Sequence, residues 1–244
     1  MRRARGWVKC AFAWVLPVLV SACATAPRDA ALPVHDPNES VNRHVLAANQ
    51  EVLRPASEFV KTVIPGPLHD RIHDFNSNLK EPRIFVNNVL QGRLDAAGRT
   101  GARFVLNSVF GVAGLHDIAA REGLPQESGD FGQTLFVWGV GAGPYVVRPY
   151  FGPGTMRDAV GSTVDIALNP LSWLTGVPVV VTVGTTGLDA ADRLGQLKMA
   201  EDASIDFYSF LRSSYYQVRR AELRGSIGLP AEIESPATSD LDDQ

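Results

Sequence analysis

The first twenty-two residues constrain this chain most, because they mark it for export. A basic start precedes an apolar stretch over residues 10–20, which Pro17 interrupts, and small residues follow. This order is typical of a secretory signal peptide. The positive charges are Arg2, Arg3, Arg5 and Lys9. We therefore predict that residues 1–22 are a signal peptide and that the mature protein is exported.

The signal ends in Val20-Ser21-Ala22-Cys23, a pattern typical of bacterial lipoproteins. In that chemistry the cysteine sulfur takes a diacylglyceryl group, and the new amine takes an acyl chain such as palmitate. Each buried methylene contributes about 0.8 kcal/mol, so two or three chains make a durable anchor. The alternatives are a signal cut without lipidation and a short membrane span, for which the apolar run is too short. We predict lipidation at Cys23.

Charge and cysteine content narrow the class of protein. Loss of the signal would remove four basic residues, which leaves nineteen against 26 acidic residues and moves the formal charge from -3 to -7. A mildly acidic exported protein is a poor candidate for binding nucleic acid, which needs clustered lysine and arginine. Of the two cysteines, Cys10 leaves with the signal and Cys23 would be lipidated, so no disulfide is expected. Further contact with a bilayer would use amphipathic helices, because no later stretch is apolar for roughly 18 residues.

The mature chain is predicted to be mainly α, with a single helical domain over 36–224. A lipidated tether over 23–35 precedes the domain, and a disordered acidic tail over 225–244 follows it. Apolar residues at helical spacing predict helices, with boundaries set by proline, glycine and capping residues. The expected helices lie near 36–63, 72–79, 81–89, 94–105 and 156–168, and, in two pieces, over 188–223.

Several local features accompany these helices. Pro55 should kink or divide the first helix, and Pro65-Gly66-Pro67 should end it. Residues 131–140 fit a short helix capped by Asp130 or a strand, whereas residues 177–183 fit a hairpin arm or a buried turn of helix. The middle of the chain, 107–153, is glycine-rich and less regular.

Two patterns bear on packing. Gly98 and Gly101 lie on one helix face, and small residues there allow close approach of another helix. In the last helix, one apolar stripe is formed by Tyr208, Leu211, Tyr215 and Val218.

The sequence lacks a recognisable catalytic motif. It contains no G-x-S-x-G elbow, no H-E-x-x-H pair and no G-x-x-x-x-G-K-[ST] loop. Residues 139–144 are similar to a dinucleotide-binding loop only superficially, because no βαβ unit surrounds them. We therefore predict that the protein is not an enzyme and binds no cofactor.

Two pairs of titratable residues leave alternatives open. His69 and His73, four residues apart, fit either two zinc ligands or two surface histidines. Asp158 and Asp165, seven apart on one helix face, fit either a glycosidase pair or helix caps and ion pairs with Arg157. In both cases the second, structural alternative is favoured, namely surface histidines for the first pair and caps and ion pairs for the second. No metal site is predicted.

A series of short motifs follows the signal in a fixed order. It begins with Asp36-Pro37-x-Glu39-x-x-Asn42-Arg43, Asn78-Leu79-Lys80-Glu81-Pro82, Asn87-Asn88-x-Leu90-Gln91-Gly92, Arg103-Phe104-x-x-Asn107-Ser108 and Gly111-x-x-Gly114-Leu115-x-Asp117. The most specific block contains Asp130, Phe131, Gly132, Trp138, Gly143, Pro144, Tyr145, Arg157 and Asp158. From residue 36 to about residue 220, the chain resembles the MlaA (VacJ) family of outer-membrane lipoproteins. It departs from the family at Ala48-Asn49, where an aromatic residue often precedes the asparagine.

The resemblance implies both a fold and a function. Members of the family remove misplaced phospholipids from the outer leaflet of the Gram-negative outer membrane and pass them to a periplasmic lipid carrier, MlaC. This activity maintains lipid asymmetry. The family fold is a ring of amphipathic helices in one membrane leaflet around a central channel, often beside a trimeric porin. Ala24, after the lipidated cysteine, fits sorting to the periplasmic face of the outer membrane.

Two groups of residues are candidate channel or headgroup contacts. The first is formed by the amides Asn42, Asn87 and Asn88, which fit either a wet channel wall or helix caps and turn contacts. The second is formed by Arg148 and Arg157, which lie in or beside the glycine- and proline-rich middle. This middle fits either tight turns or a rim where a phosphate meets arginine.

The aromatic residues and the overall function also have more than one interpretation. Two roles fit the larger aromatic residues equally well, anchoring at the membrane interface and packing in the core. These residues are Trp138, Tyr145, Tyr150 and Trp173. For function, the alternatives to phospholipid transport are a structural lipoprotein that scaffolds a porin and, less favoured, a lipid hydrolase.

Overall fold

The computed structural model describes residues 35–168, 197 and 201–230. The predicted signal peptide, Cys23, Trp173 and the segment 177–183 lie outside the described residues. The same is true of the tether before residue 35, the tail after residue 230 and most of 188–200.

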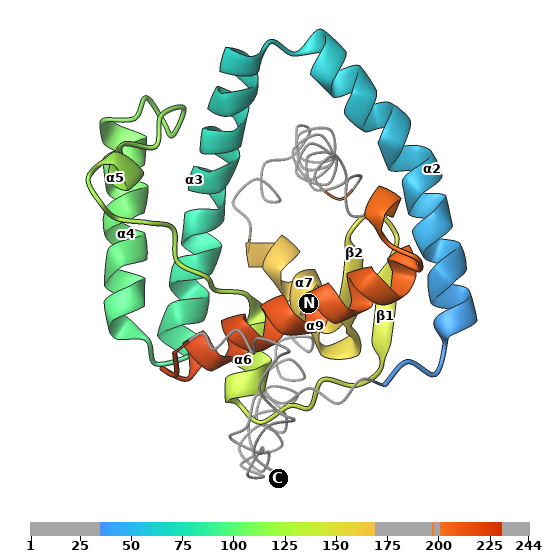
Figure 1. Cartoon of the computed structure of the whole chain (residues 1–244). Coiled ribbons are helices and arrows are strands. Elements are labelled where there is room, and N and C mark those ends of the chain that lie inside the picture. Colours follow the sequence, from blue (N-terminus) through green and yellow to red (C-terminus); the bar gives the residue numbers. More distant parts are fainter. Residues whose placement is uncertain (1–34, 169–196, 198–200, 231–244) are drawn as a thin grey trace, which may run out of the picture.

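The described part of the chain is mainly helical, as the sequence predicts, with one antiparallel hairpin. In Figure 1, α2 and α3 meet at one corner and diverge, α9 crosses between them, and α4 lies along the outer side of α3. The elements are α2 (Glu39–Val63), α3 (Gly66–Leu90), α4 (Leu94–Val109), α5 (Ile118–Arg121), α6 (Phe131–Val137), β1 (Tyr145–Arg148), β2 (Gly152–Thr155), α7 (Met156–Leu168) and α9 (Phe207–Ser226).

Proline separates the first two helices, but it does not divide either of them. The break between α2 and α3 falls at Pro65, whose extended backbone caps α3, as the Pro-Gly-Pro segment predicts. However, α2 continues through Pro55 and α3 continues through Pro82. The two short helices expected at 72–79 and 81–89 are therefore one. The packing of α3 along α4 outweighs the local cost of Pro82, since tertiary contacts override propensity.

Helices α3 and α4 bury polar side chains and expose apolar ones. The buried positions of α3 are Asn76, Asn78, Glu81, Ile84, Asn87 and Asn88, and those of α4 are Ala96, Ala97, Thr100, Arg103 and Asn107. The exposed large apolar side chains of the same pair are Leu68, Phe85, Val89, Leu90, Leu94, Phe104, Val105 and Val109. A surface helix of a protein in water has the opposite arrangement. No helix in the described ranges is both long enough and apolar enough to cross a bilayer.

An ordinary apolar core lies elsewhere, around the hairpin. Tyr145 and Val147 of β1 are buried against Phe136 of α6 and against α9. Strands β1 and β2 pair from Tyr145 with Thr155 to Arg148 with Gly152. The glycine-rich middle, described from the sequence as irregular, thus contains a hairpin.

The inward face of α9 differs from the predicted stripe at two positions. Tyr208 and Leu211 are buried, but Tyr215 is only half-buried and Val218 is exposed, and the buried line continues through Tyr216, Arg219 and Leu223. A helix has 3.6 residues per turn, so the face that contains Tyr215 returns at Arg219 rather than at Val218.

The close helix crossing lies between α6 and α7, not at the predicted glycines. A Cβ on Gly98 would meet nothing within 4 Å, and one on Gly101 would touch Phe85 at an ordinary 3.6 Å. A Cβ on Gly161 of α7 would lie 2.4 Å from the backbone nitrogen of Gly132. The backbones at this crossing leave no room for a side chain.

We predict that Gly161→Ala lowers the free energy of unfolding by roughly 2–3 kcal/mol, because the methyl group must push α6 away from α7. The matched control is Gly98→Ala, which lies in open space within a helix and should raise stability by about 0.5–1 kcal/mol. Urea unfolding of the mature protein in detergent, followed by circular dichroism, measures both. Equal effects of the two substitutions would contradict the close crossing.

Candidate functional site

The candidate site is a buried ionic network that joins α6, α7 and α9. Arg219 of α9 donates from Nη1 and Nη2 to the two carboxylate oxygens of Asp130, at 2.6 and 2.8 Å, and from Nη2 to Asp158 Oδ1 at 2.6 Å. Asp130 also accepts from the backbone nitrogen of Gln133 at 2.8 Å, which caps α6 as predicted. Two residues of the most specific sequence block thus share one cation.

Asp158 begins α7 and connects it to the hairpin and to α9. It accepts from the backbone nitrogen of Thr155 at 3.3 Å and from the Thr155 hydroxyl at 3.0 Å, and the Tyr215 hydroxyl donates to it. Burial tends to raise the pKa of Asp158, but the charge of Arg219 and the Tyr215 hydrogen bond outweigh this and lower it. Burial and the Asp158 charge raise the pKa of Tyr215. Asp158 is therefore a buried carboxylate held in its charged form.

Asp165, two turns further along α7, has different partners. It accepts from the backbone nitrogen of Phe131 at 3.1 Å and from Asn87 Nδ2 at 3.0 Å, and Arg83 lies 3.8 Å away. Burial raises the pKa of Asp165 above its ordinary value despite these contacts. Asp158 and Asp165 thus make the cap and ion-pair contacts favoured from the sequence. However, the close cation on Asp158 is Arg219, whereas the predicted partner Arg157 is 3.9 Å away.

Two asparagines of α2, the predicted Asn42 and Asn49, hold the hairpin by its backbone. Asn42 Nδ2 donates to the Tyr145 carbonyl at 3.1 Å, and the Val147 N–H donates to Asn42 Oδ1 at 2.9 Å. Asn49, two turns further along, repeats the pattern. Its Nδ2 donates to the Arg148 carbonyl at 3.0 Å, and the Tyr150 N–H donates to its Oδ1 at 2.9 Å. Both side chains are buried and pair with β1 as a neighbouring strand would.

The predicted amides of α3 are fully buried beside α6 and α7. Asn87 donates to Asp165 and accepts from the Thr134 hydroxyl at 2.8 Å. Asn88 Oδ1 accepts from Arg93 at 3.0 Å, while its Nδ2 has no hydrogen-bond partner in the described part of the chain. Asn42 and Asn87 thus make hydrogen bonds between separate elements, rather than the helix caps and turn contacts that were one of the two alternatives. A role for these amides in a channel wall stays a prediction.

The two predicted arginines differ from Arg219 because their hydrogen bonds go to neutral acceptors. The Arg157 side chain is buried, donates from Nη1 to the Val140 carbonyl at 3.2 Å, and lies over the Phe136 ring. Its Nε and Nη2 have no hydrogen-bond partner among the described residues. Arg148 is half-buried and donates to the Ser162 hydroxyl at 3.1 Å and the Pro153 carbonyl at 3.3 Å. Burial lowers the pKa of both guanidinium groups.

The remaining motif residues shape the surroundings of the network. A Cβ on Gly132 would lie 2.6 Å from Asp158 Oδ1, so only glycine fits there. Gly143 has a left-handed φ of 69°, and its Cβ would lie 3.1 Å from Met156. The carbonyl of the following residue, Pro144, accepts from the backbone nitrogen of Met156 at 3.0 Å.

The aromatic residues divide between core and surface. Tyr145 is fully buried, whereas Tyr150 is exposed. Trp138 is 40% exposed, packs edge-on against Phe131 and donates to the Leu90 carbonyl at 3.3 Å.

Sequence reasoning missed Arg219, the centre of the network, and a second buried ion pair. Arg103 Nε donates to Glu81 at 2.7 Å, and both side chains are fully buried. Arg103 also pairs with Asp117 at 2.9 Å. No local pattern in the sequence predicts these pairs, because Arg219 lies 89 residues from Asp130 and 61 residues from Asp158 along the chain.

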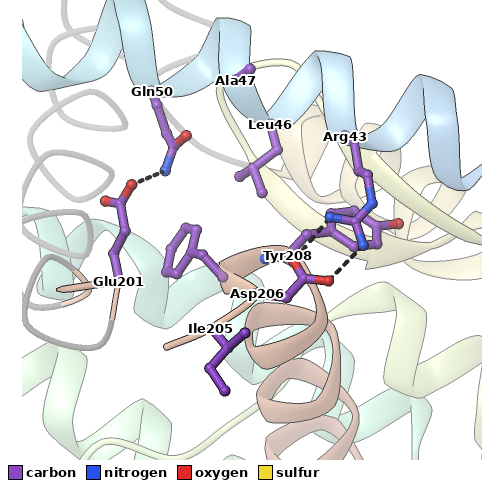
Figure 2. Close-up of a pocket in the computed structure, with 9 residues that line it drawn as sticks. Arg43, Leu46, Ala47, Gln50, Glu201, Ile205, Asp206 and Tyr208 are labelled. Atoms are coloured by element: carbon purple, nitrogen blue, oxygen red, sulfur yellow. Dashed lines mark hydrogen bonds and ion pairs between the residues drawn. The ribbon is translucent and has the colours of Figure 1, made fainter. Parts of the chain in front are cut away.

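A small pocket opens between α2 and the start of α9 (Figure 2). Leu46 forms part of its apolar lining, and Arg43 pairs with Asp206 at its edge, with 2.7 Å between Nη2 and Oδ2. Gln50 donates to Glu201 at 3.2 Å on the other side. In the described residues, no group of histidine, cysteine, aspartate and glutamate side chains is arranged to hold a metal ion.

Comparison with known proteins decides the family. The sequence profile of the MlaA lipoprotein family matches residues 34–222. The chain belongs to the MlaA lipoprotein family. It is 35% identical over 193 residues to the intermembrane phospholipid transport system lipoprotein MlaA of Escherichia coli (strain K12), covering 75% of this chain and 76% of that protein. An uncharacterised protein of Rickettsia felis is 34% identical over 207 residues, covering 79% and 80% of the two chains.

A solved structure supports the same assignment. It comes from work on the structural basis for maintenance of bacterial outer membrane lipid asymmetry. It matches with a TM-score of 0.67 and 31% identity, covering 77% of this chain and 98% of the other. The resemblance stated from the sequence motifs is therefore confirmed.

We predict that replacement of Asp158 costs more stability at pH 7 than replacement of Asp165, the other buried aspartate of α7. The folded-state pKa of Asp158 is lowered, so its contribution is complete above the ordinary carboxyl pKa and lost as pH falls through the folded pKa. Asp158→Asn should therefore cost about 2–3 kcal/mol at pH 7, and the gap to the unmodified protein should narrow in acid.

The matched control is Asp165→Asn. Because the folded-state pKa of Asp165 is raised, its ionisation opposes folding at higher pH, and the amide should cost less than about 1 kcal/mol. Urea unfolding in detergent between pH 3 and pH 7 measures both variants. A larger loss for Asp165→Asn than for Asp158→Asn at pH 7 would refute the assignment.

Proposed function

We propose that this protein is an outer-membrane lipoprotein that transports phospholipid between membranes and maintains the lipid asymmetry of the outer membrane. Membership of the MlaA lipoprotein family supports this function. The relative from Escherichia coli belongs to an intermembrane phospholipid transport system, and the matching solved structure concerns outer-membrane lipid asymmetry.

The observation that carries the proposal is the reversed polarity of α3 and α4. Their exposed face presents phenylalanine, leucine and valine, while asparagine, arginine and glutamate lie inside. Apolar surface of this extent is unfavourable in water and favourable against acyl chains. Amphipathic helices that lie in the plane of a bilayer need one apolar face of this kind. The helices therefore suit immersion in one leaflet without spanning it.

The polar interior suits the other half of a phospholipid. A headgroup in a bilayer interior needs hydrogen-bond partners, because unpaired polar groups there are costly. We infer that the protein offers the headgroup a polar path and the tails an apolar one, through a channel surrounded by the helices. This step needs no nucleotide and no covalent intermediate, so the proposed protein is a transporter and not an enzyme.

We infer that Cys23 carries the lipid anchor and holds the domain at the periplasmic face of the outer membrane. We further infer that an MlaC-type periplasmic carrier receives the phospholipid and that a trimeric porin lies beside the protein. Family membership supports these partners, and the exposed apolar faces of α3 and α4 offer surface for a neighbour in the membrane.

Loss of the gene tests the function directly. Surface phosphatidylethanolamine, labelled with an amine reagent that does not cross membranes, should rise severalfold in a deletion strain and return to normal with the intact gene. Cys23→Ala should fail to restore it, because the domain loses its anchor. Unchanged labelling in the deletion strain would refute transport. Porin binding without such a change would favour a scaffold, and phospholipid breakdown by the purified protein would favour a hydrolase.

We predict that charge on the exposed apolar faces weakens membrane binding. The test protein carries Cys23→Ala behind an ordinary signal peptide, so that lipidation does not mask the effect. Leu94→Asp with Val105→Asp, both on α4, should lower flotation with phosphatidylethanolamine–phosphatidylglycerol vesicles at least fivefold, because both side chains are exposed and each contributes about 1.5–3 kcal/mol when buried.

The control for this prediction is Gln217→Asp, which adds the same charge at an exposed polar position of α9. It should leave flotation unchanged. Circular dichroism should show the same thermal unfolding for all variants, and equal flotation of the double variant and the control would contradict immersion of these faces.

A further inference from the structure

Arg148 differs from most described arginines in having no carboxylate partner. Eight arginines lie within 3.5 Å of an aspartate or glutamate oxygen, namely Arg43, Arg54, Arg71, Arg93, Arg99, Arg103, Arg212 and Arg219. Arg148 has no such ion pair within 4 Å in the described part of the chain. Its hydrogen bonds go to neutral acceptors, and its Nε is buried without a partner.

The hairpin is built to hold this guanidinium in place. Arg148 ends β1 opposite Gly152, and its side chain contacts β2 at the Pro153 carbonyl and beside Gly154. A Cβ on Gly154 would be 3.0 Å from Arg148 Nε, so glycine leaves the space that the guanidinium occupies. Asn49 of α2 holds the backbone on both sides of Pro149, at the Arg148 carbonyl and the Tyr150 N–H.

The tip beside Arg148 is aromatic, exposed and strained. Tyr150 is 56% exposed and Phe151 is 48% exposed, and the Arg148 guanidinium lies 5.8 Å from the centre of the Phe151 ring. Tyr150 has a φ of 64°, which is uncommon for a residue with a side chain and costs about 1–2 kcal/mol. An unpaired cation thus lies next to exposed apolar rings.

These features match the chemistry of a phospholipid at the level of its phosphate. A phosphodiester carries one negative charge a few bonds from the start of the acyl chains. Arginine binds phosphate oxygens through two parallel N–H groups, and aromatic rings favour the boundary between polar and apolar regions. A bound phosphate would supply the counter-charge that Arg148 lacks.

We propose that Arg148 and the Tyr150–Phe151 tip form a binding site for the phosphate group of a phospholipid, an inference that rests on the proposed function. The phosphate accepts hydrogen bonds from the guanidinium in exchange for those to Ser162 and Pro153. The acyl chains begin beside the two rings. Asn49 is a positioning residue, because it fixes the backbone on either side of Pro149.

The test compares Arg148→Gln with Arg148→Lys in the full lipidated protein. Purified protein is extracted with organic solvent, and lipid phosphorus per protein is measured. Arg148→Gln should reduce bound phospholipid at least fivefold. Arg148→Lys should reduce it less, because lysine keeps the charge but loses the bidentate hydrogen bonding of the guanidinium. Arg99→Gln, an exposed arginine paired with Glu127, is the matched control and should bind as the unmodified protein does.

A second variant separates binding from folding. Gly154→Ala keeps the Arg148 charge but moves the guanidinium, so it should also lower bound phospholipid. A benzophenone amino acid at Tyr150 should cross-link to phospholipid in cells, and Arg148→Gln should reduce that adduct. Circular dichroism of the variants should show that the helical fold is intact.

The possible results distinguish failure of the Arg148 site from failure of the proposed transport function. If the unmodified protein carries phospholipid but Arg148→Gln carries the same amount and cross-links equally, the Arg148 site is refuted while transport stands. If the unmodified protein carries none and deletion leaves surface phosphatidylethanolamine unchanged, the proposed function fails. Titration with inorganic phosphate, followed by ³¹P NMR, distinguishes the two sources of phosphate. Binding of free phosphate at Arg148 without lipid would overturn the lipid assignment.

Discussion

The pairing of Arg219 with Asp130 and Asp158 is the interaction on which the described fold most depends. One guanidinium joins the cap of α6, the first turn of α7 and the middle of α9. All three groups are largely buried, so removal of Arg219 would leave two carboxylates without their close cation in a poorly solvated place. The close crossing of Gly132 with Gly161 follows from the same geometry, because α6 and α7 must approach for both carboxylates to reach one arginine.

Two kinds of interior lie on either side of this network. Around Tyr145, aromatic and aliphatic side chains pack as in a protein that folds in water. Along α3 and α4, amides and an arginine–glutamate pair lie inside, and apolar side chains point outward. A single solvent does not favour both arrangements. They are compatible when the core around Tyr145 lies next to water, the Tyr150–Phe151 tip lies at the boundary, and the α3–α4 side meets acyl chains, as proposed for a domain seated at the surface of a leaflet.

Local signals predicted the parts of the fold that local physics controls. Pro65 separated α2 from α3, Asp130 capped α6, and residues 156–168 formed α7 with the predicted ends. Where distant contacts decide, the sequence was a poorer guide. The passage of α3 through Pro82 depends on packing against α4, and the partner of Asp158 lies 61 residues away in Arg219. The order of the motifs identified the family because it compares whole sequences. It does not show which carboxylate meets which cation.

The distribution of partners also indicates where a ligand can bind without unfolding the site. A ligand that withdrew Arg219 or Arg103 from its carboxylates would leave buried anions unpaired, a cost of several kcal/mol. The partners of Arg148 are a hydroxyl and backbone carbonyls, each of which loses one neutral hydrogen bond of about 1 kcal/mol when the guanidinium turns to another acceptor. A phosphate that accepts from the guanidinium can offset this cost, because hydrogen bonds between charged groups are stronger than neutral ones. A protein that must take a phospholipid and release it again needs a cation of this second kind, held in place by neutral groups and free of any permanent counter-ion.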